Sequence, residues 1–118
     1  MATPKLVHYA IATARTLVSD GDDLLPSLFF RDGHERQFVL HQVSLESPDG
    51  LQEMPGLIAD ALAEGVAAIE FALILVTRDR ARIVYQRTFG SPARVWQARV
   101  HRQSASAWVG DFDETVTE

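Results

Sequence analysis

The clearest chemical potential in this sequence lies in the arginines of residues 77–102. This stretch holds seven arginines and a single acid, although the whole chain carries a formal charge of −5. The planar arginine fork fits phosphate and carboxylate groups. A basic stripe with aromatic residues between its charges is typical of a surface that binds nucleic-acid phosphates and stacks bases. The stretch therefore makes nucleic acid a candidate partner.

Three other interpretations account for the same arginines. They fit the wet face of an antiparallel sheet, a guarded sheet edge, or cations paired with acids of the same or another subunit. The chain has ten arginines, one lysine and no asparagine, which suggests a GC-rich genome that encodes positive charge as arginine by default. The strands of this stretch supply the candidate interaction residues, which are Arg80, Arg82, Tyr85, Arg87, Arg94, Trp96 and Arg99.

No catalytic or metal-binding motif stands out elsewhere in the chain. The absence of cysteine excludes disulfides, thiol catalysis and cysteine-ligated zinc. The four histidines form no HExxH motif and share no helical face, although a zinc site assembled from His41 and His101 on distant strands stays open. We expect no metal, no cofactor and no catalytic residue. The histidines are His8, His34, His41 and His101.

Two further metal patterns begin well and then fail. The run from Asp20 to Asp23 starts like a calcium loop, but Arg31 stands at the twelfth position, where a glutamate should close the site. Asp49 and Glu70 have the spacing of a metal-dependent nuclease, but no lysine follows Glu70 two residues later. We expect Glu70 to lie at a sheet border or to pair with an arginine.

Length and composition are those of one soluble globular domain. The chain has 118 residues, of which 47% are hydrophobic and 23% charged, so it can bury a core without disulfides. No apolar run reaches the roughly 18 residues that a membrane span needs. The first 20 residues fit no export signal, and we expect a cytoplasmic protein without membrane contact.

Periodicity and turn residues predict the secondary structure. Apolar residues recur at helical spacing after Thr3-Pro4 and again before Gly65, whereas Asp32-Gly33 joins two β-rich segments as in a hairpin. Residues 69–77 form an apolar run too continuous for strict alternation, which is typical of a central strand. We expect helices over 3–19 and 54–64, and strands over 27–31, 35–43, 69–77, 82–89, 94–102 and 106–112.

This order predicts an α+β fold. Strands joined by short turns give an antiparallel sheet of five or six strands, in the order α-β-β-α-β-β-β with a possible further strand. We expect a two-layer sandwich with both helices on one face, formed by residues 1–112, and a frayed acidic tail over 113–118. The open face would then present Trp96, Tyr85 or Val95 among arginines, a mixture favoured at protein interfaces.

The chain also resembles a set of small uncharacterised bacterial and phage proteins. The resemblance covers most of the chain and is carried by the hairpin pattern L-P-x-L-F-x-x-D-G, found here as LPSLFFRDG, and by the helix-to-strand join around Gly65. It implies a bacterial α+β protein and no particular activity.

Three functions follow as hypotheses. The first is a non-enzymatic protein-interaction domain, most simply a homodimer. The second is nucleic-acid association through the arginine-rich hairpin. The third is a hydrolase whose site the fold assembles from separate elements; it requires a pocket that gathers at least two of His41, Asp49, Glu70 and His101.

Overall fold

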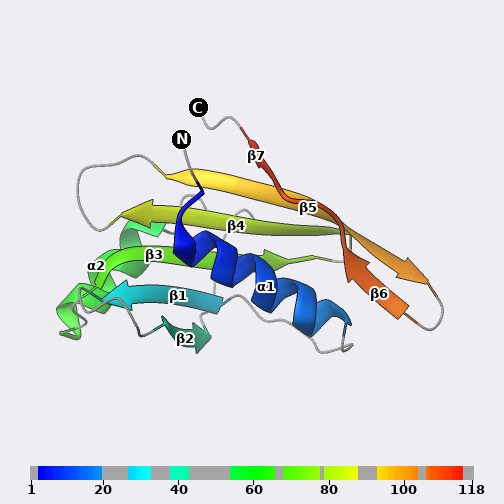
Figure 1. The fold of residues 1–118 in the computed structure, drawn as a ribbon. Coiled ribbons are helices and arrows are strands. Elements are labelled where there is room, and N and C mark those ends of the chain that lie inside the picture. The colour runs from blue at the N-terminus through cyan, green and yellow to red at the C-terminus, as the bar shows by residue number, and fades with distance from the viewer. Residues whose placement is uncertain are drawn as a thin grey trace.

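The computed structural model describes residues 3–19, 27–32, 38–42, 54–65, 68–77, 79–87, 93–103 and 106–115. Two helices and seven strands lie within these ranges (Figure 1). They are α1 (Lys5–Ser19), β1 (Ser27–Asp32), β2 (Phe38–Gln42), α2 (Met54–Ala63), β3 (Ala68–Val76), β4 (Arg80–Arg87), β5 (Arg94–Gln103), β6 (Ser106–Val109) and β7 (Asp113–Thr115). The hairpin predicted over 27–31 and 35–43 corresponds to β1 and β2, and residues 35–37 and 43 lie outside the described residues.

The strands form one curled antiparallel sheet, which confirms the predicted α+β class and element order. Its strand order is β2-β1-β3-β4-β5-β6, and β7 also pairs with β5. Both β6 and β7 are antiparallel to β5: β6 pairs with residues 100–103 and β7 with residues 95–97. The central strand is β3, as its continuous apolar run predicted.

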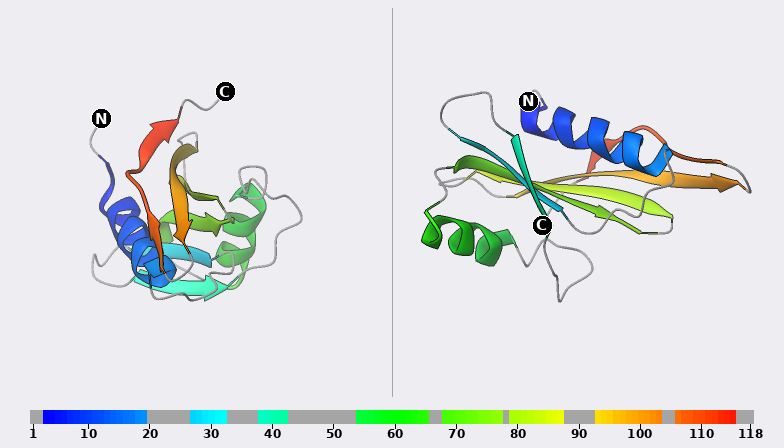
Figure 2. Two further views of the ribbon diagram at one scale, coloured as in Figure 1. Left: turned by 90° about the vertical axis from the view of Figure 1, so that its right-hand side faces the viewer. Right: turned by 90° about the horizontal axis from the view of Figure 1, so that it is seen from below.

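The two helices lie on opposite faces of the sheet, so the prediction of both helices on one face is wrong (Figure 2). The strand β3 explains the difference. Its residues Ala72 and Ile74 pack in the α1 cluster, whereas the alternating residues Phe71 and Leu73 pack with Ile58 of α2. All four of these strand residues are fully buried, and a strand that is apolar on both sides needs cover on both faces.

Strand β5 alternates as its sequence predicted. Trp96, Ala98 and Val100 are buried on the α1 side. Val95 packs on the α2 side, where Arg99 is exposed. The face opposite α1 is therefore apolar toward α2 and polar toward the far end of β5.

The chain's end is more ordered than its composition predicted. Residues 113–115 of the expected acidic tail form β7, and residues 116–118 lie outside the described residues. The expected strand over 106–112 ends at Val109, after which Phe112 packs against the α1 core. This partly buried aromatic side chain anchors the segment, which its acidic composition alone did not predict.

Helix α2 ends just before the glycine that the sequence predicted as its stop. Helix α2 is followed by Gly65, whose φ of 90° is a left-handed conformation that glycine adopts without strain, and whose N–H donates to the Leu62 carbonyl at 3.1 Å. Helix α1 has 15 residues and α2 has 10. Within the described ranges, no helix is long and apolar enough to cross a membrane.

Candidate anion-binding site

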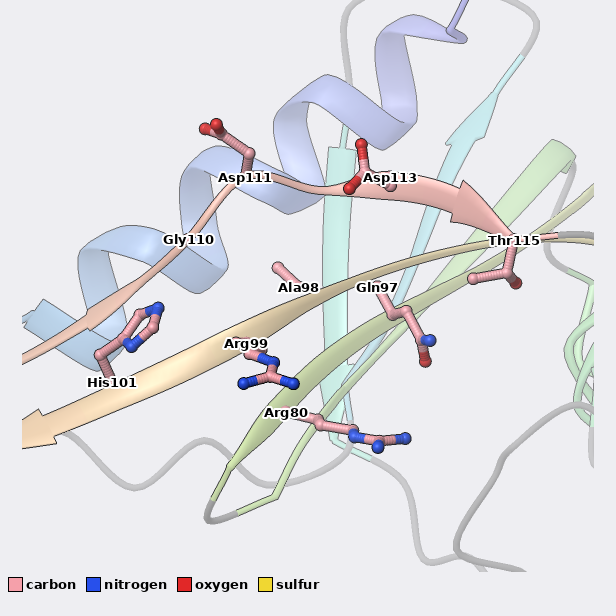
Figure 3. A pocket seen from close by; sticks show the side chains of 9 residues that line it. All are labelled: Arg80, Gln97, Ala98, Arg99, His101, Gly110, Asp111, Asp113 and Thr115. Carbon is pink, nitrogen blue, oxygen red and sulfur yellow. The ribbon is translucent and has the colours of Figure 1, made fainter.

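An open groove lies on the sheet face opposite α1, where β4 begins and β5 approaches its end (Figure 3). Its volume is about 480 Å³, within the range of small-ligand sites. Helix α2 covers the other end of this face, and no other described helix lies on it (Figure 2). The lining residues are Arg80, Gln97, Ala98, Arg99, His101, Gly110, Asp111, Asp113 and Thr115. We call this feature the arginine groove.

Two arginines face each other directly in the wall of the arginine groove. Arg80 of β4 is the register partner of Arg99 of β5, and both residues are exposed. Neither guanidinium has a hydrogen-bond or ion-pair partner among the described residues. Like charges directly opposite each other on a sheet are destabilising. Within the described part of the chain, therefore, two cations lie side by side without a neutralising acid, which is unfavourable for stability.

A third guanidinium lies on the same face beside the groove. Arg82 follows Arg80 by two residues, so their side chains lie on one side of β4. Its Nη2 donates to Oε1 of Gln97, its register partner, at 3.3 Å. This contact is with a neutral amide, so no residue in the described ranges neutralises the positive charge of Arg82.

The two acids at the groove lie apart from these cations. The carboxylates of Asp111 and Asp113 point away from the side chains of Arg80 and Arg99 (Figure 3). Asp111 instead approaches Arg15 of α1, with 3.7 Å between Oδ1 and Nη2. The groove thus has a cationic wall on β4 and β5 and an acidic rim on the segment that leads into β7.

A pair of stacked rings continues from the groove onto β6. His101 lines the groove and is the register partner of Trp108. The ring centroids are 5.3 Å apart, and the planes differ by 20°. The indole is nevertheless 41% exposed, the largest exposure of a tryptophan in this chain. A flat aromatic platform therefore lies next to the cationic wall.

The two aromatic candidates are core residues under α1 and do not reach the arginine groove. Tyr85 and Trp96 are 6% and 4% exposed, and their rings meet edge to face at 6.3 Å. The Tyr85 hydroxyl donates to Oε1 of Glu70 at 2.5 Å. Burial, and then this hydrogen bond to a carboxylate, raise the pKa of Tyr85 above its ordinary value.

Glu70 meets the expectation that it pairs with an arginine. Its Oε2 accepts from Nε of Arg31, and its Oε1 accepts from Tyr85. Glu70 is 6% exposed. The buried carboxylate is therefore neutralised and hydrogen-bonded, which is what a stable buried charge requires.

The remaining candidate arginines lie at the other end of β4 and β5. Arg94 forms a two-pronged contact with Glu114 of β7, at 2.7 and 2.8 Å, and its guanidinium lies 4.7 Å from the Trp96 ring centre. The hydrogen bond from Arg94 lowers the pKa of Glu114. Arg87 is exposed and is the register partner of Glu70. The seven candidates therefore divide: Arg80, Arg82 and Arg99 lie together, and the other four lie elsewhere.

The residues of the hydrolase hypothesis are not gathered where the structure describes them. Glu70 lies on the α1 face, whereas His101 lies on the opposite face. His41 pairs with Leu28 through the backbone of β2, and its side chain and Asp49 lie outside the described residues. In the described part of the chain, no three histidine or acidic side chains are grouped as metal ligands.

Sequence reasoning missed the aromatic part of the site. His101 was considered as a metal ligand and as part of a hydrolase site, and Trp108 was not singled out. The register of the last hairpin, in which Gln103 pairs with Ser106, places His101 opposite Trp108. A correct register from the sequence would have found the stack.

Comparisons with family models, curated proteins and solved structures found no match to this chain. The resemblance to small bacterial and phage proteins stays a prediction.

Proposed function

We propose that this protein is a non-enzymatic binding domain whose arginine groove holds an anionic group of its partner. The supporting observation is the opposed pair of Arg80 and Arg99, whose guanidinium groups have no hydrogen-bond or ion-pair partner among the described residues. Phosphate and carboxylate groups accept the paired donors that an arginine fork offers. An anion between the two guanidiniums would turn their repulsion into two attractive contacts.

The groove supplies what such a site needs besides charge. Gln97 of β5 lies between its two register partners, Arg82 of β4 and Asp113 of β7. Arg82 donates to the amide oxygen of Gln97, so the amide nitrogen is left to donate to a ligand. The groove is also open, which suits one group of a large ligand. Binding through few contacts predicts modest affinity and a clear dependence on salt.

Titration calorimetry with inorganic tripolyphosphate at about 50 mM salt tests this proposal. We expect the protein to bind tripolyphosphate and the Arg80→Glu and Arg99→Glu variants to lose most of that binding. Lys5→Glu is the matched control, because it makes the same change in net charge on α1, across the sheet from the groove.

Two results would contradict the proposal. One is no binding of tripolyphosphate by the folded wild-type protein. The other is an equal loss of binding in Lys5→Glu and Arg80→Glu, which would show that net charge acts without a site. Retained binding in Lys5→Glu alone supports the groove.

The homodimer predicted from the sequence stays a second proposal, with a changed contact surface. Tyr85 and Trp96 are buried under α1 and do not serve it. Strand β2 pairs only with β1 among the described strands, so it is an edge that a second copy can extend. Light scattering at high micromolar concentration tests this idea, and a strict monomer would count against it.

A further inference from the structure

We infer that the partner of the arginine groove is single-stranded nucleic acid, whose bases stack on Trp108 while its phosphates meet Arg80 and Arg99. This inference rests on the proposed anion-binding function and adds the class of partner. Its own observation is the exposed ring stack of His101 and Trp108, which begins inside the groove and extends beyond it. Cations that follow a backbone, combined with aromatic rings that stack bases, are the usual parts of a single-strand site.

The stack is arranged to receive a flat ring. One side of the indole meets His101 nearly in parallel, and 41% of Trp108 remains exposed. The buried residues Val100 and Val109, which neighbour the stack on β5 and β6, fix the two strands against the core below α1. The platform is therefore held by its strands, and a base that stacks on it covers apolar surface now in contact with water.

The spacing along β5 fits an extended backbone. Gln97, Arg99 and His101 project from the same face, so successive groups lie about 7 Å apart along the strand. This spacing is comparable to that of successive phosphates in an extended strand. A single strand laid along β5 can therefore place one phosphate at the arginine pair and a neighbouring base at Trp108.

The same features favour a single strand over other polyanions. An acidic peptide would use the arginines and leave the Trp108 platform unused. Bases in a duplex are stacked on one another, so their faces do not reach the platform. The formal charge of −5 also repels a long polyanion away from the groove, which favours a short contact.

Fluorescence anisotropy with a labelled thymidine strand of about eight nucleotides is the direct test. The comparison probe is a strand of equal length in which every base is replaced by an abasic residue, so the phosphates are the same and the bases are absent. We expect the thymidine strand to bind about tenfold more tightly, a difference typical of one stacked base.

Two variants separate stacking from charge. Trp108→Ala should lower the affinity for the thymidine strand to that for the abasic strand, whereas Trp108→Phe should retain most of the preference because phenylalanine still stacks. Arg80→Gln should weaken both probes equally. Thermal unfolding of each variant shows whether it is folded, and the exposed position of Trp108 on β6 favours that outcome.

The salt dependence of the affinity gives an independent estimate of how many phosphates the arginines contact. Three arginines that each meet a phosphate predict a slope of about −2 for log K against log salt, and Arg80→Gln should reduce it to about −1.4. Indole fluorescence adds a second measurement, because Trp96 is buried and Trp108 is the exposed tryptophan. Thymidine strands should quench the emission, and abasic strands should not.

The outcomes separate this inference from the proposed function. Equal affinity for thymidine and abasic strands would overturn the single-strand inference and leave the proposed anion-binding groove in place. Polyglutamate binding as tight as that of the thymidine strand would have the same consequence. Loss of tripolyphosphate binding as well removes both. A base preference that Trp108→Ala abolishes and Trp108→Phe retains supports the inference.

Discussion

Arg80→Glu should stabilise the fold while it removes most of the anion binding. Arg80 and Arg99 are directly opposite in the β4–β5 ladder, and neither guanidinium is neutralised by a described residue. Side chains so placed are about 5 Å apart at their base, where two unit charges in water repel by about 0.8 kcal/mol. Reversing one charge removes this repulsion and adds a similar attraction, from Arg99 and from the neighbouring Arg82.

The upper limit of the gain is therefore about 1.5 kcal/mol. Guanidinium groups diverge in water, and exposed pairs are commonly worth about 0.2–1 kcal/mol, so we expect a gain of about 0.5–1 kcal/mol. For a domain of this size, that gain raises Tm by about 2–5 °C. The neutral variant Arg80→Gln should gain about half as much, because it removes the repulsion and adds no attraction.

Urea unfolding at about 50 mM and at about 1 M sodium chloride measures the effect, because about 1 M salt shortens the screening length to about 3 Å. The gain should shrink at high salt. A loss of stability in Arg80→Glu at low salt would refute the reasoning, and so would a gain that salt leaves unchanged. Either result would mean that the arginine pair imposes no electrostatic cost.

Three other outcomes follow from the polar contacts and the core. Tyr85→Phe should cost about 1–3 kcal/mol, because it leaves a buried oxygen of Glu70 without its donor. In the wild-type protein the raised pKa of Tyr85 contributes to the free energy of unfolding. This contribution is fully present below about pH 10, the pKa in the unfolded chain, and it is lost as the pH rises toward the folded-state pKa. Alkaline unfolding curves should show this loss in the wild-type protein and not in Tyr85→Phe. Arg94→Gln should loosen β7 at a cost below about 1 kcal/mol, which faster amide exchange in β7 would show. In the wild-type protein the contact between Arg94 and Glu114 should weaken only in acid, as the pH falls below the ordinary carboxyl pKa and through the lowered pKa of Glu114. Ile58→Ala should cost about 2–4 kcal/mol in urea unfolding, because Ile58 is the buried residue that joins α2 to the sheet, and a fully exposed α2 would show no such loss.

Local sequence signals determined the elements and their order. Helical periodicity, the glycine at residue 65 and the alternation of Trp96, Ala98 and Val100 each depend on neighbours in the chain. Such signals survive in the fold because the same backbone geometry that creates them also sets the side-chain direction. The antiparallel class followed from the short connections between strands.

The position of α2 was decided by the tertiary structure. The sequence showed that β3 is apolar on both sides, but either face of a sheet can receive a helix that follows a hairpin. What separates the two solutions is the cover that Phe71 and Leu73 need when α1 already covers Ala72 and Ile74. The local pattern of β3 shows that both faces need cover, but which helix covers which face depends on packing between distant segments.

The candidate site divides in the same way. The sequence alone determined that cations concentrate in residues 77–102, because charge can be counted. Only the strand register decided which of them lie together. It places Arg80 opposite Arg99 and His101 opposite Trp108. Arg94 instead pairs with Glu114 of β7. A shift of one residue sends every side chain of a strand to the other face, and this register depends on pairing between strands and on the packing of the core.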